Sequence, residues 1–458
     1  MLDTFMWTAG STGHSKLRQL GRNLLGIAAL FGLSASVANA VPSYARQTGA
    51  DCASCHVGGY GPQLTPYGIQ FKLGGYTDTD GKDGKVPLSA MLVANWTRTA
   101  KDAAGADVKP HFSANDNGAM QEASLFVAGR MTDNIGSFVQ ATYSGVDRKS
   151  VLDQVDIRYA RSLQLGGKDA TVGLSFNNNP TLTDPFNTLG AWRFPYTSSD
   201  FNAGFGPSPM VESLGGSVLG LNAYAFLDKS VYAEFGLYDS MTKAALNIAN
   251  TDDIGKFKGL GTYGRVAYFK DMKRQNFSVG LLGFNTSIQD RAALGPADRY
   301  TDLGIDASYQ FLGNRQHIFT MTTSYVKEWQ KLNATAPDES KNSINQFRLA
   351  GSYHYNQTWG VTAGVFDTRG SANATANPDS LNARPTTSGY MLQADWTPWG
   401  KEGSWGAPFA NVRLGAQYTG YNKFMGGSTY TAFDADGNPV ERKARDNNTL
   451  MLFLWTSI

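Results

Sequence analysis

Apolar and polar residues alternate along most of the chain, from about residue 88 to the C-terminus. Between Tyr390 and Asp395, for example, apolar Leu392 stands between Met391 and Gln393, and the alternation continues on both sides. A two-residue period is typical of β-strands whose two faces meet different surroundings. These segments begin and end next to Gly, Asn, Asp or Pro residues, which favour turns. The pattern predicts sixteen strands, at 88–99, 119–131, 136–145, 151–163, 170–178, 217–227, 230–239, 260–269, 275–287, 300–312, 315–329, 344–356, 358–367, 387–398, 408–420 and 447–457.

The connections between these predicted strands alternate in length. Segments 100–118 and 179–216 are long, whereas 132–135 and 228–229 are short. Short turns on one rim, long loops on the other and an even strand number are typical of outer-membrane barrels, whereas a two-sheet sandwich gives no reason for the alternation. We therefore predict an all-β fold, a 16-stranded transmembrane outer-membrane β-barrel over residues 81–458. Such a barrel leaves a lumen, and an even strand number places both termini on the periplasmic rim.

One predicted strand departs from the pattern. Residues Leu450 to Trp455 alternate poorly, because apolar side chains stand at nearly every position. The other strands carry charges on the face that we assign to the lumen: Asp156, Arg158, Asp302, Asp306, Arg348, Asp395 and Arg413. We expect these charges to pair with one another and to make the barrel rigid. A path of carboxylates for a divalent cation is the second interpretation, since hard oxygen ligands favour such ions.

Composition supports the barrel and excludes a helical membrane protein. Charged residues make up only 17% of the chain, against about 25% in ordinary soluble domains, and 51 residues are Gly. Mean hydropathy is −0.31. Beyond the N-terminus no apolar run approaches the roughly 18 residues that a membrane helix needs.

The N-terminus has the pattern of an export signal. Basic residues, the first of them Lys16, precede an apolar stretch at 24–33, and Ala-Asn-Ala follows at 38–40. A charged region, an apolar region and a small-residue cleavage site define a signal peptide. We therefore predict that residues 1–40 are cleaved. The rest of the chain has equal numbers of basic and acidic residues, which excludes a nucleic-acid partner.

The only two cysteines lie in a single motif. Cys52 and Cys55 belong to the sequence Cys-Ala-Ser-Cys-His, which ends at His56. This is the attachment signature of c-type haem, in which two thiols bind one porphyrin and the histidine ligates its iron. The alternatives are a local disulfide, a redox dithiol and half a zinc site, but the zinc site lacks a second cysteine pair. We predict one covalent haem c on Cys52 and Cys55, with His56 as the proximal iron ligand.

The residues around the motif predict a small helical unit. Asp51 can cap a helix that carries the motif, and Thr65 with Pro66 begins a second helix that ends at Gly74. This second helix is apolar on more than one side, so we expect it to be buried between the haem and the barrel wall. Residues 41–80 are too few for an independent core. We therefore expect a helical haem plug that fills the barrel lumen.

The second iron ligand and the haem propionates have weaker candidates. Met91 follows the plug and faces inward by parity, and a His/Met pair raises the haem potential relative to other ligation. His354 and Met391 also face inward and are the alternatives; Met91 also suits a plain lumen-filling role. Arg46 is a candidate partner of a propionate, since a guanidinium suits a carboxylate, and a surface position is the alternative.

Four short sequences suggest a family: Pro-Ser-Tyr-Ala-Arg-Gln-Thr-Gly at 42–49, Pro-Gln-Leu-Thr-Pro-Tyr-Gly at 62–68, Phe-Lys-Leu-Gly-Gly-Tyr at 71–76 and Pro-Leu-Ser-Ala-Met at 87–91. Over 42–91 the chain resembles the fused monohaem cytochrome–porins of the outer membrane in iron-oxidising bacteria, and beyond it only the architecture is similar. The resemblance implies an oxidoreductase that oxidises extracellular Fe(II) and passes electrons to periplasmic c-type cytochromes. It also implies outer-membrane lipid around the barrel.

Two other functions fit the same sequence. An electron conduit that reduces external acceptors would have the same fold and the same haem. A solute porin with a structural haem plug would differ in its ionic conductance. A haem peroxidase would need an open distal site and catalytic donors, which we do not find in the sequence. Outer-sphere electron transfer needs no acid–base residues, and we assign none.

Overall fold

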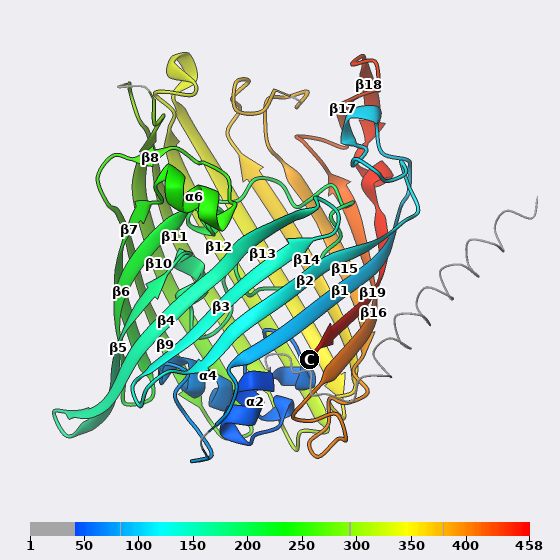
Figure 1. The fold of residues 1–458 in the computed structure, drawn as a ribbon. Helices are drawn as coiled ribbons and strands as arrows, with labels where there is room; N and C mark the ends of the chain where they lie inside the picture. The colour runs from blue at the N-terminus through cyan, green and yellow to red at the C-terminus, as the bar shows by residue number, and fades with distance from the viewer. Residues whose placement is uncertain (1–41, 83, 293–294, 379) are drawn as a thin grey trace, which may run out of the picture. The chain divides into compact units, whose positions relative to one another are not determined.

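A single antiparallel sheet that closes on itself dominates the structure (Figure 1). The computed structural model describes residues 42–82, 84–292, 295–378 and 380–458, within the compact unit Asn39–Ile458. The predicted signal peptide lies outside the described residues. No helix in the described part of the chain is long and apolar enough to cross a membrane.

The barrel wall has sixteen strands, and each pairs with its neighbours in chain order. The first pairs with both the second and the last, which closes the barrel. A two-residue strand, β8 (Lys256–Phe257), adds to the sheet beside β10. The wall strands are β1 (Leu88–Thr99), β2 (Asn117–Arg130), β3 (Ile135–Ser144), β4 (Lys149–Leu165), β5 (Lys168–Asn177), β6 (Val218–Leu227), β7 (Val231–Ser240), β9 (Gly261–Asp271), β10 (Gln275–Gln289), β11 (Asp298–Phe311), β12 (His317–Lys331), β13 (Lys341–Tyr355), β14 (Trp359–Gly370), β15 (Thr387–Trp396), β16 (Asn411–Lys423) and β19 (Thr449–Ser457).

These strands confirm the predicted fold. Every predicted strand corresponds to one wall strand, with ends that agree within three residues. The outward face is apolar and exposed, as at Leu303 and Ile305, whereas the neighbouring Asp302 and Asp306 are buried. An even-numbered antiparallel barrel with an apolar outer face is a transmembrane barrel of the outer-membrane type.

The last strand corrects one expectation. In β19 the side chains alternate regularly, with Met451, Phe453 and Trp455 buried and Leu450 and Leu452 exposed. The alternation cannot be seen in the sequence because both faces are apolar. The inward face is apolar because it packs against residues of the plug and of β1 instead of against water.

The N-terminal segment forms a helical plug at one end of the barrel (Figure 1). Its helices are α2 (Pro42–Thr48), α3 (Cys52–Cys55), the short η1 (Val57–Gly59) and α4 (Pro66–Leu73). Thr65 caps α4 as predicted, since its hydroxyl accepts a hydrogen bond from the Gly68 N–H, and Gly74 ends the helix. Asp51 does not cap α3: its carboxylate accepts instead from the N–H of Gly403, at 3.0 Å, in a turn of the barrel.

Hydrogen bonds from lumen-facing side chains hold the plug. The Tyr224 hydroxyl donates to the Leu73 carbonyl at 2.7 Å, and the Gln310 amide donates to the Leu64 carbonyl at 2.8 Å. The Arg413 guanidinium donates to the Tyr60 carbonyl at 2.6 Å. The plug is therefore fixed to several strands around the barrel.

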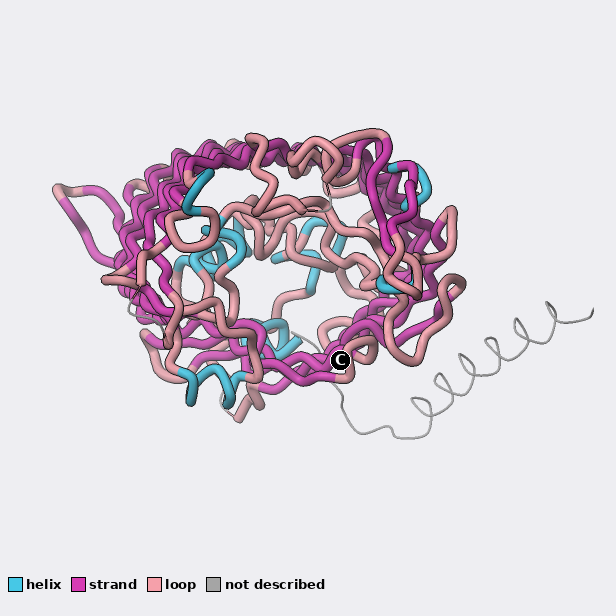
Figure 2. Tube along the Cα trace, turned by 90° about the horizontal axis from the view of Figure 1, so that it is seen from above, coloured by secondary structure: helices cyan, strands magenta, loops and turns pink. Residues whose placement is uncertain are grey.

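The long connection between β5 and β6 turns into the lumen instead of staying on the rim. Residues 177–189 are all buried, and the connection includes the turn η3 (Pro180–Thr183) and the short helix α5 (Met210–Ser213). In Figure 2 loop segments lie inside the ring of strands. The sequence placed this connection among the external loops. It also missed α6 (Lys243–Ala249), β17 (Thr429–Phe433) and β18 (Pro439–Lys443) in the long loops.

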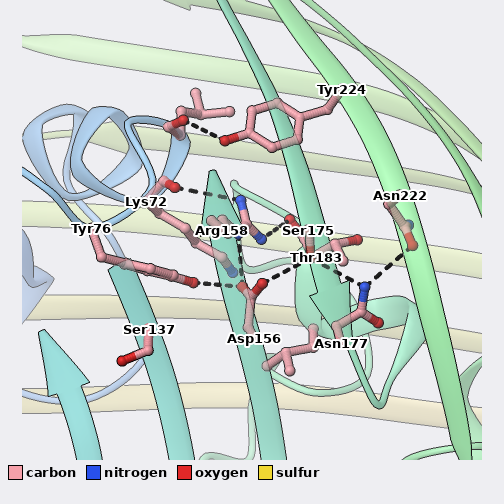
Figure 3. Close-up of polar contacts among 12 residues, drawn as sticks. Lys72, Tyr76, Ser137, Asp156, Arg158, Ser175, Asn177, Thr183, Asn222 and Tyr224 are labelled. Atoms are coloured by element: carbon pink, nitrogen blue, oxygen red, sulfur yellow. Dashed lines mark hydrogen bonds and ion pairs between the residues drawn. The ribbon is translucent and has the colours of Figure 1, made fainter. Parts of the chain in front are cut away.

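Buried charges join the plug, this inward loop and the barrel wall (Figure 3). The Arg158 guanidinium donates to Asp156 at 2.7 Å and to the carbonyl of Thr183 at 2.9 Å, and the Tyr76 hydroxyl donates to Asp156 at 2.7 Å. Arg265 similarly bridges two buried aspartates.

Most of the predicted inward charges are paired in this way. Arg413 lies 3.6 Å from Asp395. Asp302 instead accepts a backbone hydrogen bond from Val211, at 2.7 Å. Arg348 has no carboxylate within 4.0 Å among the described residues, and its guanidinium lies over the rings of Phe205 and Phe366. The lumen is therefore largely, but not wholly, ion-paired.

Candidate functional site

A cavity of about 340 Å³ lies between the plug, the inward loop and the wall strands β1 to β4 and β19. Cys52, Cys55 and His56 all line it. Its volume falls in the range of about 300–1,000 Å³ that is usual for cofactor and ligand sites. The plug thus presents its motif to an internal space and not to solvent outside the barrel.

The two cysteines are placed on one turn of helix. Cys52 and Cys55 are the ends of α3, three residues apart, so their side chains share a face. Both are half-buried and unpaired. Burial raises the pKa of both thiols, that of Cys55 to about 12. The structure therefore gives no support to the local disulfide among the alternatives, and two neutral thiols face the cavity.

His56 follows the helix in an extended conformation. Its N–H donates to the Cys52 carbonyl at 2.9 Å, and it forms a β-bridge with Leu64, which fixes the backbone next to the cavity. Its Nδ1 atom is buried without a hydrogen-bond partner among the described residues. Burial lowers the imidazole pKa to about 4. The ring is therefore neutral near pH 7, the state in which an imidazole ligates a metal.

The walls of the cavity are aromatic and apolar. Phe71 of α4, Phe126 and Phe138 of the barrel, Trp192 of the inward loop and Trp455 of β19 all line it. Phe138 contacts Trp192 edge to face, with ring centroids 5.6 Å apart. A lumen wall with this composition suits a large apolar planar group better than water.

The candidate distal ligands separate clearly. Met91 lines the cavity and packs against the apolar clusters on both sides of it. His354 is not among the residues that line this cavity; its ring packs instead against Gly58, where an added Cβ would stand 2.6 Å from its Nε2 atom. Met391 packs with Phe366 in a different cluster. The cavity therefore brings Met91, and neither alternative, together with the motif.

Arg46 is placed outside the cavity lining. Its guanidinium donates to the backbone carbonyls of Val86 and Leu88, at 3.0 and 2.7 Å. The Lys85 ammonium in turn donates to the Arg46 carbonyl at 2.7 Å. Arg46 thus fastens α2 to the chain that leads into β1, and its role toward a propionate stays a prediction.

Three charged residues of the cavity were not predicted. Lys72 of α4 is buried, and its ammonium donates to the carbonyl of Asp184 at 2.6 Å and to Asn187 at 2.9 Å. Burial lowers its pKa to about 7. Glu122 and Asp153 line the cavity from the barrel wall. A lysine between Phe71 and Leu73 in a largely apolar helix was the one signal that the sequence offered for Lys72.

No family model matches the sequence, and no curated protein matches it. Among solved structures the chain is similar to an anion-selective porin from Comamonas acidovorans, with 13% identity, a TM-score of 0.44, and 81% of this chain and 98% of that chain covered. It is also similar to the channel DcaP of Acinetobacter baumannii, with 12% identity, a TM-score of 0.43, and 81% and 96% covered. A third similar structure is Salmonella typhi OmpF in complex with daunomycin, with 11% identity, a TM-score of 0.44, and 81% and 97% covered.

Proposed function

We propose that this chain is an outer-membrane cytochrome c–porin fusion that oxidises extracellular Fe(II) and passes the electrons to periplasmic c-type cytochromes. One observation carries the proposal: two unpaired thiols and a neutral histidine with an unpartnered ring nitrogen line a single, largely aromatic cavity inside a membrane-spanning barrel. The choice of Fe(II) rests on the resemblance of residues 42–91 to iron-oxidising cytochrome–porins.

The residues present fit a covalent haem c. Cys52 and Cys55 would hold it through thioethers, His56 would be the proximal ligand and Met91 the distal one. The aromatic walls would cover the ring and exclude water. When bound, the haem supplies a one-electron centre within the insulating thickness of the membrane.

The chain itself does three things for this reaction. The hydrogen bonds between plug and wall fix the motif, the neutral imidazole of His56 is ready to ligate, and the apolar walls keep the site dry. A His/Met ligand pair in a dry site favours a high potential, which suits an acceptor of electrons from Fe(II). Each Fe(II) would lose one electron to become Fe(III), and a periplasmic cytochrome would take that electron.

A solute porin with a structural haem is the second candidate, because the barrel alone fits it. The plug and the buried loop residues 177–189 oppose it, since they occupy the lumen. An outward conduit would use the same residues, and only its potential and its partners would differ.

Rapid mixing of Fe(II) with the oxidised protein in membranes tests the proposal. We expect the haem spectrum to change to that of the reduced state as Fe(II) is consumed. A normal haem spectrum that Fe(II) leaves unchanged, while a non-metal reductant such as ascorbate reduces the haem, would remove the Fe(II) assignment and favour the alternatives.

A further inference from the structure

Two carboxylates line the cavity that contains Cys52, Cys55 and His56, which we call the haem cavity. They lack the charged partners that other lumen carboxylates have. Asp156, Asp306 and Asp395 each face an arginine. The Glu122 carboxylate, in contrast, has no hydrogen bond or ion pair among the described residues, and the Asp153 carboxylate accepts only from the Thr142 hydroxyl, at 3.2 Å. Half-buried carboxylates without a counter-charge are costly, because the lumen does not solvate them as bulk water does.

A strand irregularity lies at or beside each of these carboxylates. The pairing of β1 with β2 shifts at Val93 and Ala94, so that Gln121 and Glu122 both turn to the lumen. The pairing of β3 with β4 shifts in the same way, and Asp153 and Gln154 both line the cavity. A β-bulge adds one residue and re-aims a side chain, often next to a functional site.

The surroundings of the pair are rich in oxygen atoms. The hydroxyls of Ser124 and Thr142 lie 2.9 Å apart on the ladder between Glu122 and Asp153. Thr197 of the inward loop is only 7% exposed and lines the same cavity, and its Oγ1 atom has no hydrogen-bond partner in the described structure. An unpartnered buried hydroxyl and two uncompensated carboxylates are what a hard divalent cation requires.

A third acidic residue, Asp200, lies in a second cavity between the long loops. It follows Thr197 by three residues, and this second cavity has a volume of about 590 Å³. Its N–H donates to Gln121, the neighbour of Glu122, at 3.3 Å. Carboxylates thus line both cavities, Asp200 the one between the long loops and Glu122 with Asp153 the one beside the motif.

We propose that Glu122 and Asp153 bind the divalent cation substrate inside the haem cavity, and that Asp200 lies on its path from the mouth. The inference rests on the proposed function, because it identifies the cation as Fe(II). It gives the two carboxylates the counter-charge that no arginine or lysine in the described residues supplies. It also places the electron donor in the same cavity as its acceptor.

Manganese(II) is a suitable probe of the site, because it prefers oxygen ligands and the haem does not oxidise it. The holoprotein is titrated with Mn(II), and the free Mn(II) is measured by electron paramagnetic resonance. We expect the wild type to bind Mn(II). The double variant Glu122→Gln with Asp153→Asn should bind it about 10- to 100-fold more weakly. Glu441→Gln, an exposed carboxylate in β18, is the matched control and should bind as the wild type does. No Mn(II) binding by the wild type, or equal binding by the double variant, would overturn the proposal.

A second readout separates this site from the proposed function. In the double variant, the rate of haem reduction at low Fe(II) concentration should fall by a factor similar to the loss of Mn(II) affinity. The rate of reduction by ascorbate should equal that of the wild type. The haem spectrum reports that the variant is folded. If Mn(II) binding depends on the two carboxylates but Fe(II) never reduces the wild-type haem, the cation site stands and the iron-oxidase function fails. If Fe(II) reduces both proteins at equal rates, the function stands and the site fails.

Discussion

At the scale of the residue, the cavity gives each side chain a protonation state and a direction. His56 is neutral because burial lowers its pKa, and Met91 faces the same space from β1. Neither property follows from the motif alone. The sequence predicted a haem site at Cys52, Cys55 and His56 because the spacing of the motif is specific, and the structure places all three on one cavity. It missed Glu122 and Asp153 as cavity residues; Asp153 is the extra residue of a bulge, which breaks the two-residue period on which inward and outward assignments depend.

Replacement of Met91 by Leu tests the distal ligand. We expect the haem spectrum to lose the features of sulfur ligation and the potential to fall, because Leu cannot ligate iron. The stability cost should stay below about 1.5 kcal/mol, since the side chains have similar volumes. Met391→Leu, at a buried methionine away from the cavity, should leave the spectrum unchanged. An unchanged spectrum in Met91→Leu would exclude this residue as a ligand.

Lys72 should make stability depend on pH. Its pKa is about 7 in the folded protein and about 10.4 in an unfolded chain, so the unfolded state binds more protons between these values. The free energy of unfolding should therefore rise as the pH increases from about 7 to 10. Below pH 7, Lys72 is charged in both states and this gain in stability is absent. We expect the Lys72→Met variant to lack this rise when thermal midpoints are compared with those of the wild type across pH 6–9. Parallel pH profiles for the two proteins would contradict the assignment.

At the scale of the element, the segment after the motif depends on close packing against the barrel. Gly59 has a φ of +69°, and a Cβ there would collide with the carbonyl oxygen of Gly400 in the turn after β15. Asn411 of β16 also donates to the Gly59 carbonyl, at 2.8 Å. This contact fixes the loop that carries His56 against the wall.

Gly59→Ala should therefore displace the loop, alter the haem spectrum and increase cleavage of the plug by added protease. Gly81→Ala is the matched control, because Gly81 has a similar φ of +78° but a Cβ at this position would have nothing within 4 Å. Both positions have a positive φ in the same region, so a difference between the two variants reports packing. Equal effects of the two substitutions would argue against a tight plug–wall contact.

Strands were more predictable than loops for a physical reason. A wall between lipid and a polar lumen imposes a two-residue period, and this period is visible in the sequence of β11 and most other strands. The inward loop was missed because its buried residues, such as Asn178 and Asp184, are the polar types that also suit exposed turns. Its burial is decided by partners far away in sequence, such as Arg265.

At the scale of the whole barrel, the lumen is occupied instead of open. The plug enters at the end of the barrel where β1 begins and β19 ends, and the inward loop packs between plug and wall. The buried pair of Asp156 and Arg158 belongs to the wall, and hydrogen bonds join it to Tyr76 of the plug and to Thr183 of the inward loop. The barrel therefore encloses a site and does not simply enclose a channel.

Single-channel recording should show this occupancy. We expect the intact protein in a planar lipid bilayer to pass far less ionic current than an open sixteen-stranded porin, because helices α2 to α4 and residues 177–189 fill the interior. An open, steady current of porin size would favour the solute-porin alternative.

The central claim is that a covalent haem lies within the barrel, against the aromatic wall. A high-resolution electron cryomicroscopy map of the protein purified with its haem tests it most directly. The account predicts density for one porphyrin joined to Cys52 and Cys55, enclosed by the barrel and within reach of His56 and Met91. A porphyrin outside the barrel, or intact protein that carries none, would contradict the account.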